Sequence, residues 1–324
     1  MKAMHFARPG GDEVLELVER PVPAPRRGEV VVKVAASGVN GPDLMQRRGL
    51  YPAPKGASDL LGLEVSGTVV EVADDVTRWR QGDRVTALTN GGGYAEYCAV
   101  DARHVLPIPA GVGLEEAAGL PEAYFTIWSN LFHDGGLKAG QLLLVHGGAG
   151  ALGSTAIQLA KAFDVQVIAT DSPSERCGYC TEIGADVSID YAREDFVELV
   201  RQRGGADMIL DIVGGANVEK NFKAAKHSGR IVQLAFAAGS KVQIDLMPLM
   251  LKRLVYTGST LRTRSPEYKA KIARQIEALV WPKFEEGRIR ATHSHRFGLS
   301  SAAEAHRLME ARGHFGKVIL TPDA

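Results

Sequence analysis

The spacing of apolar residues changes along the chain and predicts three successive stretches. The first hundred residues carry short, valine-rich runs that Gly, Pro and Asp interrupt, which is typical of strands. We predict strands at 29–40, 63–72, 82–88, 92–100 and 104–109. Because no long segment among them has helical spacing, this stretch predicts a mainly β domain of the barrel type.

From Gln141 onward, apolar runs alternate with amphipathic segments. We predict strands at 142–146, 165–171, 186–190, 208–213, 230–236 and 254–260. We predict helices near 151–163, 174–183, 193–202 and 217–227. The strands are almost continuously apolar, as in a parallel sheet with both faces covered, so the pattern predicts a doubly wound α/β domain.

After residue 262 the chain carries a long helical segment, a short helix at 300–311 and a final strand, "GKVIL", at 316–320. This last stretch is too short for a domain of its own, and we expect it to fold back onto the β-rich first stretch.

Composition narrows the class of protein. The chain has 324 residues, 45% of them apolar, which is enough for two domains. The 38 Lys and Arg residues equal the 38 Asp and Glu residues, so no basic surface invites nucleic acid or an acidic membrane. No apolar run at the start has the form of a signal peptide or reaches the roughly 18 residues of a membrane helix. We therefore expect a cytoplasmic protein without a nucleic-acid or membrane partner, and its three cysteines form no disulfide framework.

A glycine-rich turn follows the first strand of the alternating stretch. Gly148, Gly150 and Gly153 spell G-x-G-x-x-G between a predicted strand and a predicted helix, and a second strand ends in Asp171. In this context the motif indicates a dinucleotide site, because glycines allow the tight turn, the approach of a pyrophosphate and close helix–strand packing. The start of the helix offers its backbone N–H groups to the phosphates, which adds Ala151 and Leu152 to the predicted cofactor-binding residues.

Several motifs stand in the order seen in medium-chain dehydrogenases/reductases. They are "ASGVNGPDLMQRRGLYP", "LGLEVSGTVVEV", "GDRV", "GGGYAEY", "GGAGALGSTAIQLAKA" and "GKVIL". The sequence resembles this family over nearly its whole length, and most resembles its zinc-free quinone oxidoreductases, the zeta-crystallin-like branch. The resemblance implies a GroES-like β-barrel catalytic domain of residues 1–122 and 262–324. It also implies a doubly wound Rossmann NAD(P)-binding domain of residues 123–261, with the active cleft between the two.

The positions of the metal ligands in the related zinc alcohol dehydrogenases predict that no metal is bound here. Those enzymes carry a Cys where this chain has Asn40, and a Gly-His-Glu where it has Gly62, Leu63 and Glu64. Zinc needs three or four N, S or O donors, and Leu63 offers none. Without a Lewis acid, hydride from the nicotinamide requires an electron-poor acceptor, so we expect a small-molecule quinone or enone.

The resemblance also implies which residues form the site. Asn40 and Tyr51 are the predicted catalytic residues near the nicotinamide, and Thr126 and Lys317 are predicted to bind the cofactor. A tyrosine hydroxyl donates to a developing oxyanion, or its ring stacks on a flat acceptor. Three simpler interpretations remain open: Tyr51 as a packed loop residue, Asn40 as a turn residue bonded to its own backbone, and Thr126 as an ordinary helix residue.

The residues that follow the predicted strand 165–171 do not decide between NADPH and NADH. An acidic residue at the position of Asp171 usually accepts hydrogen bonds from the ribose hydroxyls of NAD. The alternative is that Asp171 is a turn or helix-cap carboxylate. Family members mostly use NADPH and have a small residue there. Arg176 keeps the family's basic position, and Tyr191 matches a family tyrosine beside the adenosine 2′-phosphate. NADPH and NADH therefore both remain candidates.

Other functions and features remain to be weighed. A 2-enoyl thioester or alkenal reductase would use the same hydride chemistry with a placed acid such as Tyr51, and "QRRG" at 46–49 is the only nearby basic group for an acyl-CoA. A crystallin-like structural or binding protein that keeps the nucleotide site is an alternative of another class.

Two further expectations concern the cysteines and the oligomeric state. We expect "CGYC" at 177–180 to supply buried helix thiols. The family's edge-strand pairing predicts a homodimer through 254–260.

Overall fold

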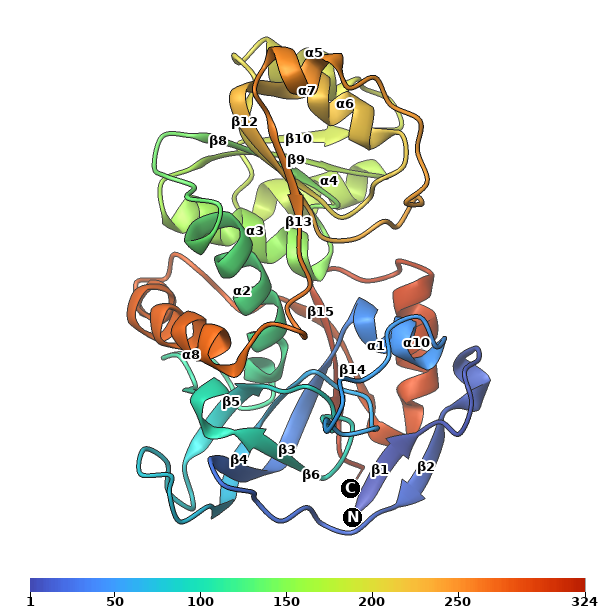
Figure 1. The fold of residues 1–324 in the computed structure, drawn as a ribbon, viewed down its shortest axis with the longest axis vertical. Coiled ribbons are helices and arrows are strands. Elements are labelled where there is room, and N and C mark those ends of the chain that lie inside the picture. Colours follow the sequence, from blue (N-terminus) through green and yellow to red (C-terminus); the bar gives the residue numbers. More distant parts are fainter. Residues whose placement is uncertain (324) are drawn as a thin grey trace. The chain divides into compact units, whose positions relative to one another are not determined.

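The computed structural model describes residues 1–323, which form two compact units (Figure 1). The first unit is Met1–Phe125 together with the chain from Arg262 onward, and the second is Thr126–Leu261. The boundaries implied by the resemblance, 122/123 and 261/262, stay predictions. No helix within residues 1–323 is long and apolar enough to cross a membrane.

The first unit is built on a mixed sheet around β3 (Glu29–Val39), which pairs antiparallel with β4 (Glu64–Val72), β6 (Tyr97–Asp101) and β15 (Lys317–Thr321). The sheet order is β14-β15-β3-β4-β5-β7, and β6 pairs with β3 beside this path. The last strand of the chain thus completes the sheet of the first hundred residues, as the sequence predicted. The other strands are β1 (Lys2–His5), β2 (Glu16–Glu19), β5 (Arg84–Leu88), β7 (Val105–Pro107) and β14 (His293–Gly298).

Alternating apolar residues supply the core of this unit. Val30, Val32 and Val34 of β3 are buried and pack with Val65 and Val69 of β4. Burying a valine side chain stabilises the fold by about 1.5–3 kcal/mol, so this cluster is a main support of the sheet. The helices of the first unit are α1 (Gly41–Arg47), α8 (Pro266–Gln275), α9 (Trp281–Glu285) and α10 (Ala302–Glu310). Helix α2 (Pro121–Ile127) runs across the division between the units.

The second unit contains a six-stranded parallel sheet in the order β10-β9-β8-β11-β12-β13. Numbered from β8, this is the order 3-2-1-4-5-6 of a doubly wound Rossmann-type fold, which confirms the predicted class. The strands are β8 (Leu142–His146), β9 (Gln166–Asp171), β10 (Val187–Asp190), β11 (Ala206–Asp211), β12 (Ala225–Gln233) and β13 (Val255–Gly258). The helices are α3 (Ala151–Ala162), α4 (Ser174–Glu182), α5 (Phe196–Arg201), α6 (Asn217–Ala224) and α7 (Met247–Leu251).

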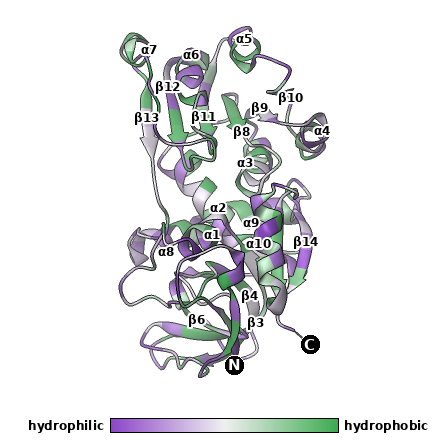
Figure 2. Ribbon diagram, turned by 90° about the vertical axis from the view of Figure 1, so that its right-hand side faces the viewer, coloured by the Kyte–Doolittle hydropathy of each residue, from purple (hydrophilic) through white to green (hydrophobic). Residues whose placement is uncertain are grey.

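The strand order determines where this unit offers a binding edge. All five residues of β8 are buried, and Figure 2 shows β8 and β11 as hydrophobic strands in the sheet. The order reverses between these two neighbours, and ligands of doubly wound sheets bind outside the carboxyl ends of the strands at such a point. The glycine-rich turn that follows β8 lies at this edge.

Candidate functional site

Two glycines of the turn are required by the fold itself. A Cβ at Gly148 would lie 2.7 Å from Cys180 Sγ, and a Cβ at Gly153 would lie 2.2 Å from the carbonyl oxygen of Gly147. Gly147 itself has φ +72°, which L side chains rarely adopt. The packing of α4 and β9 against the turn therefore accounts for Gly148, and the close approach of α3 to the turn accounts for Gly153, without any ligand.

Gly150 is different, because nothing in the protein demands a glycine there. Its φ is −77°, and a Cβ would meet only the carbonyl oxygen of Gly147, at 3.5 Å. Gly150 is also the N-cap of the 12-residue helix α3 and supplies no side-chain cap to it. An uncapped helix N-terminus beside a position kept bare fits a diphosphate, which needs close backbone approach and the positive end of the helix dipole.

Asp171, Arg176 and Tyr191 lie together beside this turn. Asp171 Oδ2 accepts the N–H of Ala149 at 2.8 Å, and Oδ1 accepts Arg176 Nε at 2.7 Å. Tyr191 directly follows β10, is half exposed, and donates its N–H to the Asp171 carbonyl at 3.3 Å. Asp171 thus accepts a backbone N–H of the turn, as a turn carboxylate does, and Arg176 compensates its negative charge.

A buried polar network supports the turn from below, and sequence reasoning missed it. His146 bonds through Nδ1 to Thr170 Oγ1 and through Nε2 to Asn221 Oδ1, both at 2.8 Å. Asn221 Nδ2 donates to Asp211 Oδ2 at 2.8 Å, and Asp211 Oδ1 accepts the N–H groups of Val213 and Gly214. Burial lowers the pKa of His146 and so favours its neutral form, and the ring joins β8, β9 and α6 through these hydrogen bonds.

In the first unit, Asn40 forms a buried cluster with Glu64 and Lys317. Asn40 Nδ2 donates to Glu64 Oε1 at 2.8 Å, and Asn40 Oδ1 accepts Lys317 Nζ at 2.6 Å. Lys317 Nζ also lies 2.5 Å from Glu64 Oε1, and the backbone N–H of Glu122 donates to Glu64 Oε2 at 2.8 Å. All three side chains are at most 4% exposed. Two small residues make room for them: a Cβ at Gly38 would lie 2.0 Å from Glu64 Oε1, and one at Gly119 would lie 3.1 Å from Lys317 Cβ.

This cluster bears on the predicted roles of Asn40, Lys317 and a metal. Lys317 was predicted to bind the cofactor, and in the structure its ammonium group is hydrogen-bonded to Asn40 and ion-paired with Glu64. The Glu64 carboxylate, the one metal donor of the Gly62-Leu63-Glu64 segment, is neutralised by an ammonium instead. No group of three His, Cys, Asp or Glu side chains suited to a metal ion occurs among residues 1–323.

Tyr51 and Thr126 were the other predicted contacts of the nicotinamide. Tyr51 is half-buried, and burial raises the pKa of its phenol while the nearby cation of Arg262 acts to lower it. Thr126 is buried in α2, and its carbonyl accepts Ser129 Oγ and Asn130 Nδ2. The contacts of Tyr51 and Thr126 with a cofactor or acceptor remain predictions.

The structure also describes the basic segment "QRRG" and the cysteines of "CGYC". Arg47 of "QRRG" is not available for an acyl-CoA phosphate: it is fully buried, ion-paired with Glu310 and bonded to His306 Nδ1 at 3.0 Å. Cys177 and Cys180 are buried in α4, as expected, and burial raises the pKa of Cys180 to about 12. The two thiols are therefore packing groups rather than a redox pair.

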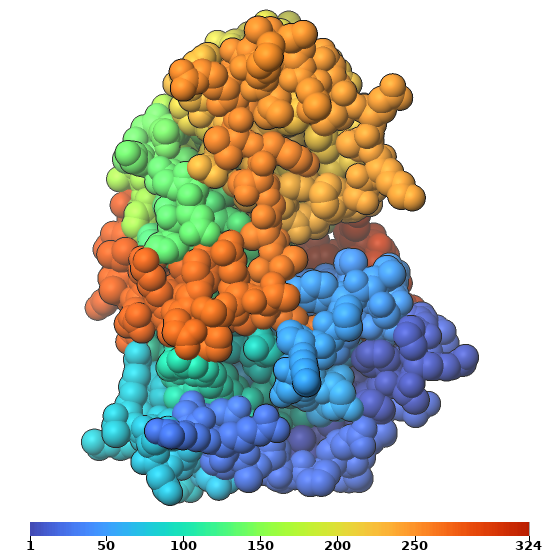
Figure 3. All heavy atoms as spheres, in the orientation of Figure 1, coloured from blue at the N-terminus to red at the C-terminus, as the bar shows by residue number. Residues whose placement is uncertain are grey.

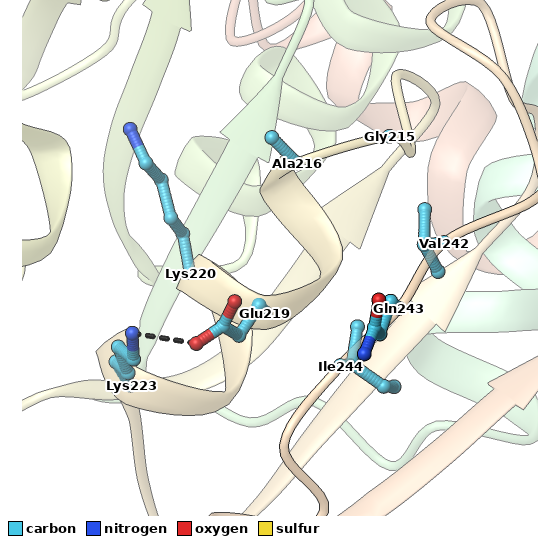
Figure 4. Close-up of a pocket in the computed structure, with 8 residues that line it drawn as sticks. All are labelled: Gly215, Ala216, Glu219, Lys220, Lys223, Val242, Gln243 and Ile244. Atoms are coloured by element: carbon cyan, nitrogen blue, oxygen red, sulfur yellow. Dashed lines mark ion pairs between the residues drawn. The ribbon is translucent and has the colours of Figure 1, made fainter.

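One cavity of about 380 Å³ lies in the second unit between α6 and the segment 242–244 (Figure 4). Glu219 and Lys223 form an ion pair of 2.7 Å at its wall, while Lys220 points away from them. The residues predicted for the site are not among those that line it, which are Gly215, Ala216, Glu219, Lys220, Lys223, Val242, Gln243 and Ile244. The cavity therefore adds nothing to the nucleotide site.

Comparisons with known proteins give a family match for each of the two units. The alcohol dehydrogenase GroES-like domain matches residues 26–110, and the zinc-binding dehydrogenase family matches residues 151–278. A quinone oxidoreductase of Pseudomonas aeruginosa is 33% identical over 328 residues, which cover 99% of each chain. A mycobacterial protein solved in complex with NADPH superposes with a TM-score of 0.89 at 31% identity, over 99% of this chain and 100% of that one. An NAD-dependent alcohol dehydrogenase superposes with a TM-score of 0.88 at 28% identity, over the full length of both chains.

A GroES-like unit, a Rossmann-type unit and a relative of one-third identity over the full length define the class. The chain belongs to the medium-chain dehydrogenase/reductase family, in its quinone oxidoreductase-like branch.

Proposed function

We propose that this protein is a reductase that transfers hydride from NADPH or NADH to a quinone or a similar conjugated carbonyl compound, without zinc. The observation that carries the proposal is Gly150, a position that neither packing nor backbone conformation requires to be glycine, at the uncapped start of α3. Backbone N–H groups of Ala151, Leu152 and Gly153 would hold the diphosphate there. The bound nicotinamide supplies the hydride, and the protein binds and orients both reactants.

The environment of Asp171 supports use of either cofactor. An isolated carboxylate would repel the 2′-phosphate of NADPH, but this one is paired with Arg176 at 2.7 Å. Asp171 still has lone pairs that would accept a ribose hydroxyl of NADH. Arg176 and the exposed Tyr191 both bond to Asp171, and they would flank a 2′-phosphate there.

The polar cluster of the first unit supports the choice of acceptor. Both hydrogens of the Asn40 amide are used, on Glu64 Oε1 and on the Gly38 carbonyl, and the ammonium of Lys317 is paired. Because these groups are bonded to one another, we propose that carbonyl polarisation falls to hydrogen bonds, with the half-buried Tyr51 as the donor. Such modest assistance suits an acceptor that is already electron-poor.

The test is a panel of quinones, enones and 2-enoyl thioesters, assayed by loss of reduced nicotinamide absorbance with NADPH and with NADH. We expect quinones or simple enones to react fastest, and added zinc or chelator to leave the rate unchanged. A preference for enoyl thioesters would favour the 2-enoyl or alkenal reductase, in which Tyr51 would act as the acid. If neither nucleotide raises the melting temperature, the alternative of a structural protein gains support.

We also propose a homodimer formed along β13. This strand is the edge of the parallel sheet, and α7, which precedes it, buries none of its residues. Leu246, Met247, Met250, Leu251, Val255 and Tyr256 are each 39–67% exposed. Figure 2 shows α7 as a hydrophobic coil, and Figure 3 shows orange atoms of this part of the chain on the viewed face. Exposed apolar patches beside a bare strand edge favour self-association.

Light scattering tests the dimer directly. We expect twice the chain mass for the wild type, and the monomer mass for a variant with Met250→Asp and Leu251→Asp. Leu50→Asp, at another exposed leucine in the first unit, should leave the mass at that of the dimer. A wild type that elutes and scatters as a monomer would overturn this proposal.

A further inference from the structure

Arg262 is an unusual cation in the first unit, because it is buried against neutral acceptors. Its side chain donates through Nε and Nη2 to the carbonyl oxygen of Asn90, at 3.1 and 2.5 Å, and through Nη1 to Gln46 Oε1 at 2.6 Å. Arg262 is 6% exposed, and burial lowers its pKa. Burying a cation against neutral oxygens costs free energy, so its retention calls for a reason beyond packing.

A second buried cation, Lys269, bonds to Asn90 and to the backbone of Arg262. Lys269 Nζ donates to Asn90 Oδ1 at 2.8 Å and to the backbone carbonyl of Arg262 at 2.9 Å. It is 1% exposed, and burial together with the charge of Arg262 lowers the pKa of Lys269 to about 8. The guanidinium is therefore fixed at both its head and its backbone, and a second positive charge increases the potential around it.

The fixed cation faces Tyr51. Arg262 Cζ lies 5.6 Å from the centre of the Tyr51 ring, within the range of a cation–π contact. Two charged groups act on the phenol in opposite directions: Arg262 favours its ionised form and Glu122 disfavours it. Asp43 acts in turn on Arg262, where it favours the charged guanidinium. Arg262 is the group in contact with the ring.

We propose that Arg262 is a positioning residue for Tyr51, which it holds by its ring and makes a stronger hydrogen-bond donor toward the acceptor oxygen. The inference rests on the proposed function. When hydride adds to a carbon of the acceptor, an electron pair moves onto its oxygen, and the Tyr51 O–H donates to that oxygen. A cation beside the ring withdraws charge from the phenol, and a fixed donor needs no reorganisation as the oxygen becomes negative. Three of the five guanidinium N–H groups donate to Asn90 and Gln46 and fix Arg262 in place, and Tyr51 is the group through which we expect it to act.

The first experiment needs no acceptor. Tyrosinate absorbance is titrated with pH in the wild type and in Tyr51→Phe, and the difference gives the titration of Tyr51. The same pair is measured in the Arg262→Met background. We expect the pKa of Tyr51 to rise when the cation is removed and to return toward the wild-type value in Arg262→Lys. Arg264→Met is the matched control, because Arg264 Cζ lies 4.7 Å from the ring of Tyr268 instead.

The second experiment separates positioning from structural support. We expect Arg262→Met to lower kcat roughly tenfold with little change in KM for the acceptor, a smaller loss than removal of a direct oxyanion donor. In the Tyr51→Phe background, the same substitution should change kcat less than about twofold. Arg262→Lys should recover part of the loss, and melting temperatures report whether each variant is folded.

Two results would overturn the inference: an unchanged titration of Tyr51 in folded Arg262→Met, or an equal loss of kcat with and without the Tyr51 hydroxyl. The titration distinguishes this failure from a failure of the proposed function, since it gives a result even if no acceptor in the panel is reduced.

Discussion

The two units prepare their candidate sites in opposite ways. In the second unit, the site is a stretch of backbone: a turn with little side chain at the start of α3, supported by the buried polar network of His146, Asn221 and Asp211. In the first unit, the site is a set of ionisable side chains, with Asn40 held between Glu64 and Lys317 and with Asp43 close by. The site in the second unit depends on residues with little or no side chain. The site in the first unit depends on buried charges that must be paired.

This difference predicts how each site responds to change. Removing one member of a buried charge pair leaves the other without compensation, so substitutions in the first unit should act on folding. Adding atoms to a bare backbone position should act on binding, provided that the fold tolerates them. The predictions below take these contrasts in order of expected effect.

Lys317→Met should have the largest effect. It leaves the Glu64 carboxylate buried at 0% exposure without its ammonium, and we expect the free energy of unfolding to fall by about 3–5 kcal/mol. Urea denaturation measures it. The double variant Glu64→Gln with Lys317→Met should recover part of the loss. Lys161→Met, which breaks the exposed pair with Asp186 in the second unit, should cost less than about 1 kcal/mol. Equal losses for the two lysines would contradict the comparison.

Asp43→Asn should change how stability depends on pH. Burial raises the pKa of Asp43 from 3.8 to about 6, against the N–H groups of Asn40 and Gly62, which lower it. Between about pH 4 and about pH 6 the unfolded chain is ionised at this residue and the folded chain is not, so folding takes up a proton and stability falls as pH rises.

The stability of the wild type minus that of Asp43→Asn should therefore fall across this window, by at most about 3 kcal/mol, and be flat on either side. Denaturation curves at a series of pH values measure the difference. A difference that does not vary with pH would show that Asp43 titrates normally.

Gly150→Val should weaken nucleotide binding with little change in stability. The new Cβ meets only the Gly147 carbonyl oxygen, at 3.5 Å, and we expect the side chain to project where the diphosphate is proposed to lie. We expect Kd for NADPH to rise at least roughly tenfold, since one hydrogen bond to a charged group contributes about 1.5–3 kcal/mol. Fluorescence titration and melting temperature measure the two effects. Gly153→Ala is the contrast, because its Cβ would overlap the Gly147 oxygen and should destabilise the fold first.

Arg176→Ala should have the smallest effect, on cofactor choice. Without the guanidinium, the Asp171 carboxylate is no longer offset, and the ratio of kcat/KM for NADPH to that for NADH should fall, by up to roughly fivefold. Asp171→Asn should shift the same ratio toward NADPH. Steady-state kinetics with both cofactors measures the ratio, and a rise in Arg176→Ala would mean that Asp171 does not face the 2′ position.

The sequence predicted the second unit well because its signals are local. The apolar runs of β8 and β11 and the spacing of Gly148, Gly150 and Gly153 each lie within a few residues of one another. Helix α7 was not predicted, since its five residues, Met247–Leu251, are apolar without a helical period.

The polar cluster of the first unit could not be predicted in the same way. Val39 pairs with Val318, which places Lys317 beside Asn40, and Ser37 pairs with Val65, which places Glu64 beside Gly38. The pairing of Glu64 with Lys317 therefore depends on the register of three strands, including one at the far end of the chain. The one available signal was Gly38, a glycine inside a strand, which often marks close approach of another group.

The lowered pKa of His146 has a consequence for the coenzyme. An imidazole directly before the glycine turn would ordinarily gain a proton on mild acidification and add a positive charge beneath the diphosphate. Burial moves that gain of charge at His146 to lower pH, so mild acidification changes the charge beneath the turn less than it would with an exposed imidazole. The affinity for a nucleotide bound at the turn would then depend less on pH.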